Sequence, residues 1–387
     1  MRLHLRSVAN NPRRPSGSNG CHNKRDESAS TNVLGTIYGM TYTCSILPSG
    51  KTFPVDPHET ILEAALRGGV VLPYGCKDGA CGSCKATLTQ GEVDYGDYQK
   101  KALTDAERDA GHVLLCKATA MSDISVTARI VAAEGMAPIR KLPCRVATLS
   151  NPAPDVAVVR LQLPASEQFQ FLAGQYVDIL LKDGKRRSYS MANPPHDAQQ
   201  LELHIRHTSG GAFTDAVFGT ATASCNALKE KDILRFEGPQ GTFFLREDSV
   251  RPIVFLASGT GFAPIKAIIE HARFKHIERP MTLYWGGRRP HDLYMAALAE
   301  TWAREMPWFK YVPVVSDALP EDQWTGRTGF VHQAVMQDFP DLSGHSVYAC
   351  GAPIVIQSAQ RDFIAECGLL DEEFFADAFT TAADLAQ

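Results

Sequence analysis

Four cysteines offer the clearest chemistry in this sequence of 387 residues. Cys76, Cys81 and Cys84 share the stretch YGCKDGACGSCK, and Cys116 follows in HVLLCK. A disulfide framework, a zinc site and an iron–sulfur cluster are three possible uses of thiols this close together. Structural zinc usually takes two short C-x2–4-C pairs, whereas C-x4-C-x2-C…C is the pattern of a plant-type [2Fe–2S] cluster. The spacing therefore predicts a [2Fe–2S] cluster held by these four residues.

The surroundings of the cysteines favour the cluster over disulfides. Gly75, Gly79 and Gly82 would allow positive φ angles that turn backbone N–H groups toward the sulfurs. Hydrogen bonds of this kind tune the reduction potential of a cluster. The chain has ten cysteines but no apolar core of a secretory signal, so we expect a reducing, cytoplasmic compartment in which structural disulfides are rare.

The segments around the cysteine loop predict a small domain that would position it. TYTCSILPSGKTFPV reads as two strands joined by a Pro-Ser-Gly turn. HETILEAALRGG places its apolar residues on one helical face. The later segments KATLT, LTDAERDAG and SDISVTA predict a strand, a short helix and a strand. This order matches the β-grasp arrangement of plant-type ferredoxins, which we assign to residues 40–131.

The rest of the chain predicts two further domains after a Pro-containing linker at 132–143. Six short strand-like segments with turn signals between them predict an antiparallel β-barrel over 144–246. Over 247–387, the apolar strands PIVFLAS, MTLYWGG, KYVPVVS and HSVYACG alternate with helical stretches, which is typical of a parallel α/β sheet. The expected fold class is therefore multidomain α+β and α/β.

Composition limits the possible partners. No apolar run approaches the ~18 residues of a membrane span, so no membrane partner is expected. The net charge of −4 divides into +4 over residues 1–39, with six Lys/Arg and two Asp/Glu, and −8 over the remainder. The negative balance argues against a nucleic-acid surface. The head at 1–39 is rich in Asn, Ser and Arg without apolar periodicity, and we expect it to be disordered.

Two glycine-containing segments could bind phosphate groups. HIRHTSGGAFT forms a basic helix start suited to a pyrophosphate. ASGTGFAPIKAIIEH follows an apolar strand and opens a helix, and its glycines allow close phosphate approach. It lacks the third glycine of the dinucleotide fingerprint, so a plain strand–helix turn is equally compatible with this segment alone. The candidate residues in the two segments are Arg206, Gly210, Gly211, Thr214, Gly259, Thr260 and Gly261.

Several motifs taken together resemble the ferredoxin–NADP⁺ reductase superfamily, namely RSYS, GGAFT, SGTGFAP, YACGAP and FFADAFT. With the N-terminal ferredoxin pattern, the chain from Met40 onward resembles the three-domain iron–sulfur flavoprotein reductases. The reductase components of phenol, benzoate and methane oxygenases belong to this group. YGCKDGACGSCKA, LAGQYVD, RRSYS, EGPQGTFF, TGFVHQAV and YACG resemble in particular the CDP-6-deoxy-Δ3,4-glucoseen reductase-like proteins.

The resemblance implies an NAD(P)H-dependent oxidoreductase with FAD and a [2Fe–2S] cluster. A flavin can transfer electrons from NAD(P)H to the cluster because it accepts hydride and releases electrons singly. The expected acceptor is a protein, either a sugar dehydratase or a terminal oxygenase. A non-catalytic redox sensor is the alternative from another class, and the intact motifs argue against it. Arg288 and Arg289 could meet a 2′-phosphate, but such arginines are often solvated, and we expect NADH.

The resemblance also implies roles for residues near the flavin. Arg187 should bind its phosphates, Tyr189 should lie against the isoalloxazine, and Ser190 should hydrogen-bond near N5. A pyrophosphate site favours FAD over FMN. The residues expected at that site are Arg206, Gly210, Gly211 and Thr214.

A second group of residues is implied for the nicotinamide dinucleotide. Cys350, next to Gly351, should lie beside the nicotinamide at the end of a parallel strand, although a buried core thiol is the commoner fate of a lone cysteine. Phe379 should cover the flavin face that the nicotinamide must reach, or else be a core aromatic. The dinucleotide itself should lie on Gly259, Thr260 and Gly261. Ser190, Cys350 and Phe379 are the candidate catalytic residues.

Overall fold

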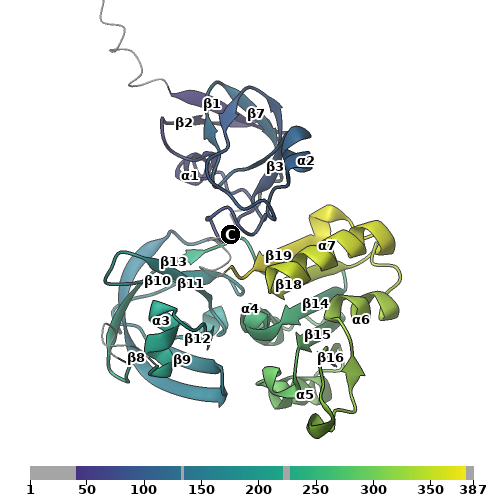
Figure 1. The fold of residues 1–387 in the computed structure, drawn as a ribbon. Helices are drawn as coiled ribbons and strands as arrows, with labels where there is room; N and C mark the ends of the chain where they lie inside the picture. Colours follow the sequence, from purple (N-terminus) through teal and green to yellow (C-terminus); the bar gives the residue numbers. More distant parts are fainter. Residues whose placement is uncertain (1–40, 132–134, 221–226, 381–387) are drawn as a thin grey trace, which may run out of the picture. The chain divides into compact units, whose positions relative to one another are not determined.

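The computed structural model describes residues 41–131, 135–220 and 227–380, which form three domains (Figure 1). The expectations for the head at 1–39 concern residues outside these ranges. No helix in the described part of the chain has the length and apolar character needed to cross a bilayer.

The first domain is a five-stranded mixed sheet with the order β2-β1-β7-β3-β5, which confirms the predicted ferredoxin-type fold. Strands β1 and β2 form the expected antiparallel hairpin, and β1 pairs in parallel with β7. Both helices begin with a capping box, in which a threonine and a glutamate three residues later satisfy each other's backbone N–H groups. The elements are β1 (Tyr42–Leu47), β2 (Lys51–Val55), α1 (Ile61–Arg67), β3 (Lys85–Gln90), β4 (Val93–Asp94), α2 (Asp105–Asp109), β5 (His112–Leu114), β6 (Thr119–Ala120) and β7 (Ile124–Thr127).

The second domain is an antiparallel six-stranded sheet with the order β11-β10-β13-β8-β9-β12. A bridge between Met191 and Leu203 joins the segments at the two edges, so the sheet closes on itself as the predicted barrel. Its elements are β8 (Arg140–Ala153), β9 (Val156–Gln162), β10 (Tyr176–Leu180), β11 (Arg186–Ser190), β12 (Gln200–Arg206), α3 (Ala212–Phe218) and β13 (Ile233–Gln240).

The first strand of the barrel begins inside the segment that the sequence assigns to the linker. Residues 140–143 of β8 pair with β13, with Arg140 opposite Gly238 and Pro143 opposite Arg235. Proline cannot donate to a sheet ladder, and it usually argues against a strand. The start of this strand was therefore not predicted, although its residues alternate between exposed and buried, with Leu142 buried.

The third domain, drawn in green and yellow in Figure 1, contains a parallel sheet. The sheet has six strands in the order β17-β16-β15-β14-β18-β19. Apolar residues of α4 and α5 pack on one side of the sheet, and those of α6 and α7 pack on the other. The sequence analysis missed the two edge strands, β17 and β19. The elements are β14 (Ile253–Ser258), α4 (Phe262–Phe274), β15 (Met281–Gly287), α5 (Ala296–Glu305), β16 (Phe309–Val315), β17 (Arg327–Thr328), α6 (Val331–Asp338), β18 (Ser346–Gly351), α7 (Pro353–Cys367) and β19 (Phe374–Ala378).

Candidate functional site

The four candidate cluster cysteines approach one another in two pairs. Cys76, Cys81 and Cys84 lie in the loop between α1 and β3, and Cys116 follows β5. The side chains of Cys76 and Cys81 are close enough to interact, and so are those of Cys84 and Cys116. In the described part of the chain, no three His, Cys, Asp or Glu side chains converge as a site for one metal ion. Two pairs suit a two-iron cluster, in which each iron takes two cysteines, so these residues fit the predicted group.

Backbone N–H groups of the loop point at the sulfurs, as the glycine content suggested. The N–H of Asp78 donates to Cys76 Sγ at 3.3 Å, and the N–H of Cys76 donates to Cys81 Sγ at 3.5 Å. The interaction between Cys76 and Cys81 lowers the pKa of Cys81 and raises that of Cys76, so Cys81 is the first thiol of this pair to ionise.

The predicted role of the loop glycines is confirmed at two positions and wrong at the third. Gly79 and Gly82 have φ angles of +74° and +81°. Gly75 has no positive φ; instead, a Cβ there would lie 3.3 Å from Ser83 Oγ and 3.4 Å from Cys81 Sγ. A side chain at this position would therefore crowd Ser83 and Cys81.

The cysteine loop is hydrogen-bonded to the barrel within the compact unit formed by residues 40–387. The buried hydroxyl of Tyr176 on β10 donates to the carbonyl oxygen of Gly75 at 2.8 Å. The N–H of Tyr74 donates to Thr242 Oγ1 at 3.0 Å, and that hydroxyl donates back to the Tyr74 carbonyl at 3.1 Å. These bonds hold the loop beside strand β10, whose partner β11 carries the candidate flavin residues.

Strand β11 presents three candidate flavin residues in different environments. Arg187 forms no ion pair within the described ranges, and its guanidinium donates only to the neighbouring Arg186 carbonyl at 2.7 Å. Such an unpaired guanidinium is available to a phosphate. Tyr189 packs against Phe213 of α3 with ring centroids 5.6 Å apart. Ser190 is buried and donates to Asp377 Oδ2 at 3.3 Å.

The turn before α3 is closed by its own side chains. Thr214 Oγ1 donates to the carbonyl oxygen of Thr208 at 2.8 Å. A Cβ at Gly211 would lie 2.5 Å from Thr214 Oγ1, and Gly210 has a φ of +78°. The turn therefore requires both glycines. The Thr214 hydroxyl stabilises the backbone of this turn, which is the candidate site for the flavin phosphates.

Arg206 differs from Arg187 because acidic partners already surround it. It pairs with Asp292 at 2.9 Å and with Asp155 at 3.3 Å. A Cβ at Gly259 would lie 3.4 Å from its guanidinium. Arg206 thus lies between the barrel and the start of α4, against the candidate dinucleotide loop.

The loop at Gly259–Gly261 is a 3₁₀ turn packed against the end of β18. A Cβ at Gly261 would lie 2.0 Å from the carbonyl oxygen of Cys350, which is far inside van der Waals contact. Gly259 has a φ of +54°, and its carbonyl accepts from Trp285 Nε1 at 3.0 Å. Only glycine allows this approach at position 261, so the loop, with Thr260 at its centre, has the close-packed geometry that a dinucleotide site requires.

Replacing Gly261 by Ala should therefore distort the loop. Overpacking against backbone should cost about 1–3 kcal/mol of unfolding free energy and weaken nicotinamide nucleotide binding by about tenfold. Gly344→Ala is the matched control, because no heavy atom lies within 4 Å of a Cβ there. Chemical unfolding and nucleotide titration would measure both effects. Equal behaviour of the two variants would contradict the role of close packing at Gly261.

Ser190 meets one residue of the third domain, Asp377, whose neighbour on β18 is Cys350. Cys350 is fully buried, and its neighbour across the β18–β19 pair is Asp377. Burial raises the pKa of Cys350 well above its usual value. Burial also raises the pKa of Asp377 to about 7, although the hydrogen bond from Ser190 opposes this shift. The three side chains place a hydroxyl, a thiol and a carboxyl at one edge of the parallel sheet.

Phe379 continues the chain just after this group. Its N–H donates to the carbonyl oxygen of Gly351 at 2.8 Å, and its half-buried ring packs against the apolar core of the third domain. Gly351 has a φ of +137°, and a Cβ there would lie 2.5 Å from the Ser258 carbonyl oxygen. The end of β19 is thereby fixed beside the end of β18.

Sequence reasoning missed Asp377, although a signal for it was present. The motif FFADAFT carries one carboxylate among apolar residues, so burial of those residues would bury the acid with them. A buried carboxyl needs a specific partner, and Ser190 supplies it from 187 positions away in the sequence. No sequence pattern indicates that pairing.

Three family models match the chain, each over one of the domains described above. The 2Fe-2S iron-sulfur cluster binding domain matches residues 45–121, the oxidoreductase FAD-binding domain 143–245 and the oxidoreductase NAD-binding domain 255–361.

Curated proteins and solved structures match most of the chain. A CDP-6-deoxy-L-threo-D-glycero-4-hexulose-3-dehydrase reductase from Yersinia pseudotuberculosis is 43% identical over 340 residues, covering 88% of this chain and 99% of its own. Reductase component 2 of a terephthalate 1,2-dioxygenase from Comamonas is 37% identical, covering 88% and 98%. The crystal structure of an Amycolatopsis cytochrome P450 reductase matches with a TM-score of 0.69 and 34% identity, covering 88% of this chain and 100% of that one.

Proposed function

We propose that this chain, which belongs to the family of iron–sulfur flavoprotein reductases, supplies electrons to a sugar dehydratase. Members of this family join a [2Fe–2S] ferredoxin domain to FAD- and NAD-binding domains. It is an NAD(P)H-dependent oxidoreductase in which electrons pass from the nicotinamide to FAD and then to the cluster. We also propose that it acts in the cytoplasm, since its cluster thiols need a reducing compartment.

The bound groups supply the redox chemistry, because flavin exchanges hydride for single electrons and the cluster carries one electron at a time. The chain supplies binding and orientation. When FAD is bound, Arg187 would hold its phosphates and Tyr189 would contact its ring. Ser190 Oγ would lie near the reacting edge of the flavin. Its hydroxyl donates to Asp377 Oδ2, so donation to the flavin would require that bond to break, or Asp377 to hold a proton and donate to Ser190 Oγ instead.

The nicotinamide side of the site is proposed to use the third domain. Gly259, Thr260 and Gly261 bear the dinucleotide phosphates, and Cys350 and Gly351 lie at the end of β18 where the nicotinamide ring enters. Phe379, whose N–H donates to Gly351, is proposed as the aromatic residue that would cover the flavin face reached by the nicotinamide. Gly210, Gly211 and Thr214 are proposed as the pyrophosphate contacts of FAD. Arg206 is proposed as a fourth contact, which would have to exchange Asp292 and Asp155 for the pyrophosphate.

We base the preference for NADH on Arg289 alone, because Arg288 is exposed and its guanidinium has no ion pair among the described residues. The Arg289 guanidinium is held by Asp322 in two contacts of 2.6 and 2.8 Å, and Glu321 lies 3.5 Å away. A guanidinium neutralised in this way has little charge left for a 2′-phosphate. The acids also add negative charge, which would repel that phosphate.

The choice of acceptor rests on the relatives. The 43% identity with the dehydrase reductase over nearly its whole length supports a sugar dehydratase acceptor. The 37% identity with the terephthalate dioxygenase reductase supports the second candidate, a terminal oxygenase.

Reconstitution with each class of acceptor tests this proposal. The protein, loaded with FAD and cluster, would be mixed with NADH and either a CDP-sugar dehydratase with its substrate or the oxygenase component of an aromatic dioxygenase. We expect NADH oxidation coupled to deoxysugar formation in the first mixture and only slow, uncoupled oxidation in the second. Coupled product formation in the second mixture alone would favour the oxygenase assignment.

A further inference from the structure

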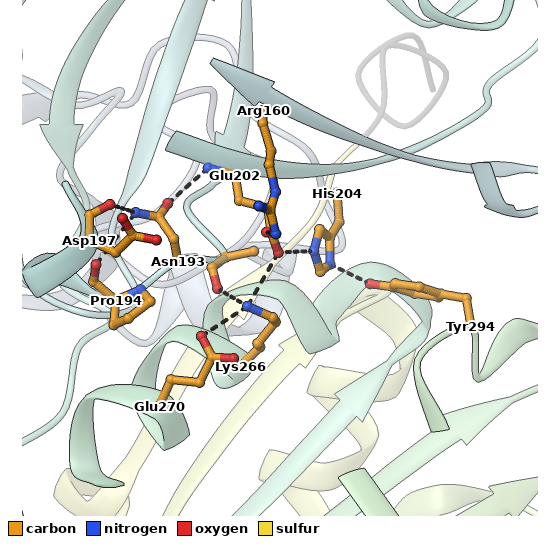
Figure 2. Close-up of polar contacts among 10 residues, drawn as sticks. Arg160, Asn193, Pro194, Asp197, Glu202, His204, Lys266, Glu270 and Tyr294 are labelled. Carbon is orange, nitrogen blue, oxygen red and sulfur yellow. Dashed lines mark hydrogen bonds and ion pairs between the residues drawn. The ribbon is translucent and has the colours of Figure 1, made fainter. Parts of the chain in front are cut away.

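A buried polar network joins the barrel to the parallel α/β domain, apart from the residues assigned to the cofactors (Figure 2). The barrel contributes Arg160 on β9 and Glu202 and His204 on β12. The α/β domain contributes Lys266 on α4 and Tyr294, which follows β15. Glu202, Lys266 and His204 are nine-tenths or more buried. Burying such groups is costly unless every charge is paired.

Lys266 makes the first link across the domains. Its ammonium group donates to the Ala192 carbonyl at 3.1 Å and lies 3.3 Å from Glu202 Oε1, both in the barrel. Its third contact, at 2.9 Å, is with Glu270 one turn along α4. The ammonium group therefore has two hydrogen-bond acceptors, Ala192 and Glu270, and an ion pair with Glu202; Ala192 and Glu202 belong to the other domain. Sliding the domains apart would leave a buried cation with a single partner.

His204 and Tyr294 make the second link. The imidazole Nε2 lies 2.9 Å from Glu202 Oε1, and Nδ1 lies 2.8 Å from the Tyr294 hydroxyl. Burial lowers the pKa of His204, so the ring is neutral. The carboxylate can only accept, so the hydrogen-bond network assigns the proton to Nε2 and leaves Nδ1 to accept from the tyrosine hydroxyl. His204 Nε2 is thus the donor to Glu202, and the Tyr294 hydroxyl is the donor to His204 Nδ1.

The charge on Glu202 connects the two links. Burial acts to raise its pKa, but the hydrogen bond from His204 and the neighbouring cations outweigh burial and lower the pKa to about 2. The Arg160 guanidinium forms an ion pair with the second oxygen of this carboxylate, with 2.9 Å between Arg160 Nη2 and Glu202 Oε2. Glu202 therefore stays ionised and holds the lysine and histidine links together.

The links attach to the backbone very near the proposed reacting groups. Ala192 lies two residues after Ser190, and Lys266 lies on the helix that begins directly after Gly261. His204 lies two residues before Arg206 on the same strand. The network therefore ties the strand that carries Ser190 to the helix that follows the dinucleotide loop.

A cavity of about 490 Å³ lies over this network, lined among others by Arg160, Glu202, Lys266 and Glu270. A ligand site would be expected to offer an unpaired polar group. These four charges already have partners inside the protein. The arrangement thus favours a structural link between domains over a binding site.

We propose that Lys266, His204 and Tyr294 are positioning residues that fix the orientation of the α/β domain against the barrel, and with it the approach of the nicotinamide to the flavin. This inference rests on the proposed transfer of hydride between the two domains. None of the three residues needs to touch either cofactor. Their effect is on the geometry of the transfer, and nucleotide affinity should stay unchanged.

Tyr294→Phe is the most conservative test, because it removes one hydroxyl and keeps the ring. A misplacement of about 1 Å can cost ~100-fold in rate, so losing one link should slow flavin reduction by NADH about 10-fold, and Lys266→Met about 100-fold. Stopped-flow absorbance at increasing NADH would separate the limiting rate from the apparent dissociation constant. Tyr311→Phe is the matched control, since the Tyr311 hydroxyl is buried without a partner among the described residues.

A second readout does not depend on turnover. Hydrogen–deuterium exchange of the FAD-loaded protein should be faster in peptides covering β12 and α4 in Tyr294→Phe, and unchanged there in Tyr311→Phe. Rates of flavin reduction within twofold of the unmodified protein in both Tyr294→Phe and Lys266→Met would overturn the inference. So would a slower rate that comes with equal weakening of NADH binding. Failure of the unmodified protein to reduce flavin with NADH would instead refute the proposed function itself.

Discussion

Replacing Cys81 by Ser should abolish electron delivery to cytochrome c while leaving NADH–ferricyanide turnover largely intact. Cys81 pairs with Cys76 in the loop that carries three of the four candidate ligands. Without it the cluster site is incomplete, and the outlet for single electrons is lost. A small oxidant such as ferricyanide can take electrons from the flavin directly, whereas a protein acceptor should need the cluster.

The control for this experiment is another cysteine of the same domain. Cys44 lies fully buried in β1, in the core of the first domain. Cys44→Ala should therefore retain both activities. Steady-state assays with the two acceptors, together with the flavin content of each variant, give the comparison. Equal loss of both activities in Cys81→Ser with flavin still bound would refute the assignment of this residue to the outlet.

Replacing Ser190 by Ala should slow flavin reduction by ~30- to 1,000-fold, since a hydrogen bond to developing charge is worth ~2–4 kcal/mol. The hydroxyl is buried and oriented by Asp377, so water cannot readily replace it. Cys350→Ala should act differently, because it loosens nicotinamide placement while NADH still binds; misplacement of about 1 Å can cost ~100-fold.

Ser188→Ala provides the matched control on the same strand. Ser188 also donates to a carboxylate, Asp178 Oδ1 at 2.6 Å, but that acid lies on β10 within the barrel. Its loss should leave the hydride step at the speed of the unmodified protein. Stopped-flow absorbance reads that step before the cluster is reduced. If Ser190→Ala and Cys350→Ala both reduced flavin at the unmodified speed, the proposed flavin–nicotinamide geometry would be incorrect.

Local patterns in the sequence were enough to predict the fold class. The cysteine spacing, the alternating strands of the barrel and the apolar strands of the α/β domain each depend on residues close together in the chain. Strand β19 was missed because FFADA is short and carries an acid, which disfavours a buried strand. The start of β8 was missed because Pro143 indicates a break.

The contacts that join the domains could not be predicted in this way. Tyr176 bonds to Gly75, Ser190 to Asp377, and Lys266 to Glu202. In each case the partners lie in different domains, and each residue alone has an ordinary alternative as a core or surface side chain. Their roles follow from burial and pairing, which only the three-dimensional arrangement provides.

Anaerobic titration of the purified protein with NADH tests the central claim most directly. An FAD takes two electrons and a [2Fe–2S] cluster takes one, so full reduction should need about 1.5 equivalents of NADH. We predict bleaching of both the flavin and the iron–sulfur absorbance, together with an electron paramagnetic resonance signal from the reduced cluster. Bleaching of the flavin alone, complete at about one equivalent of NADH, would contradict the account. The flavin would then accept hydride without passing electrons to the [2Fe–2S] cluster.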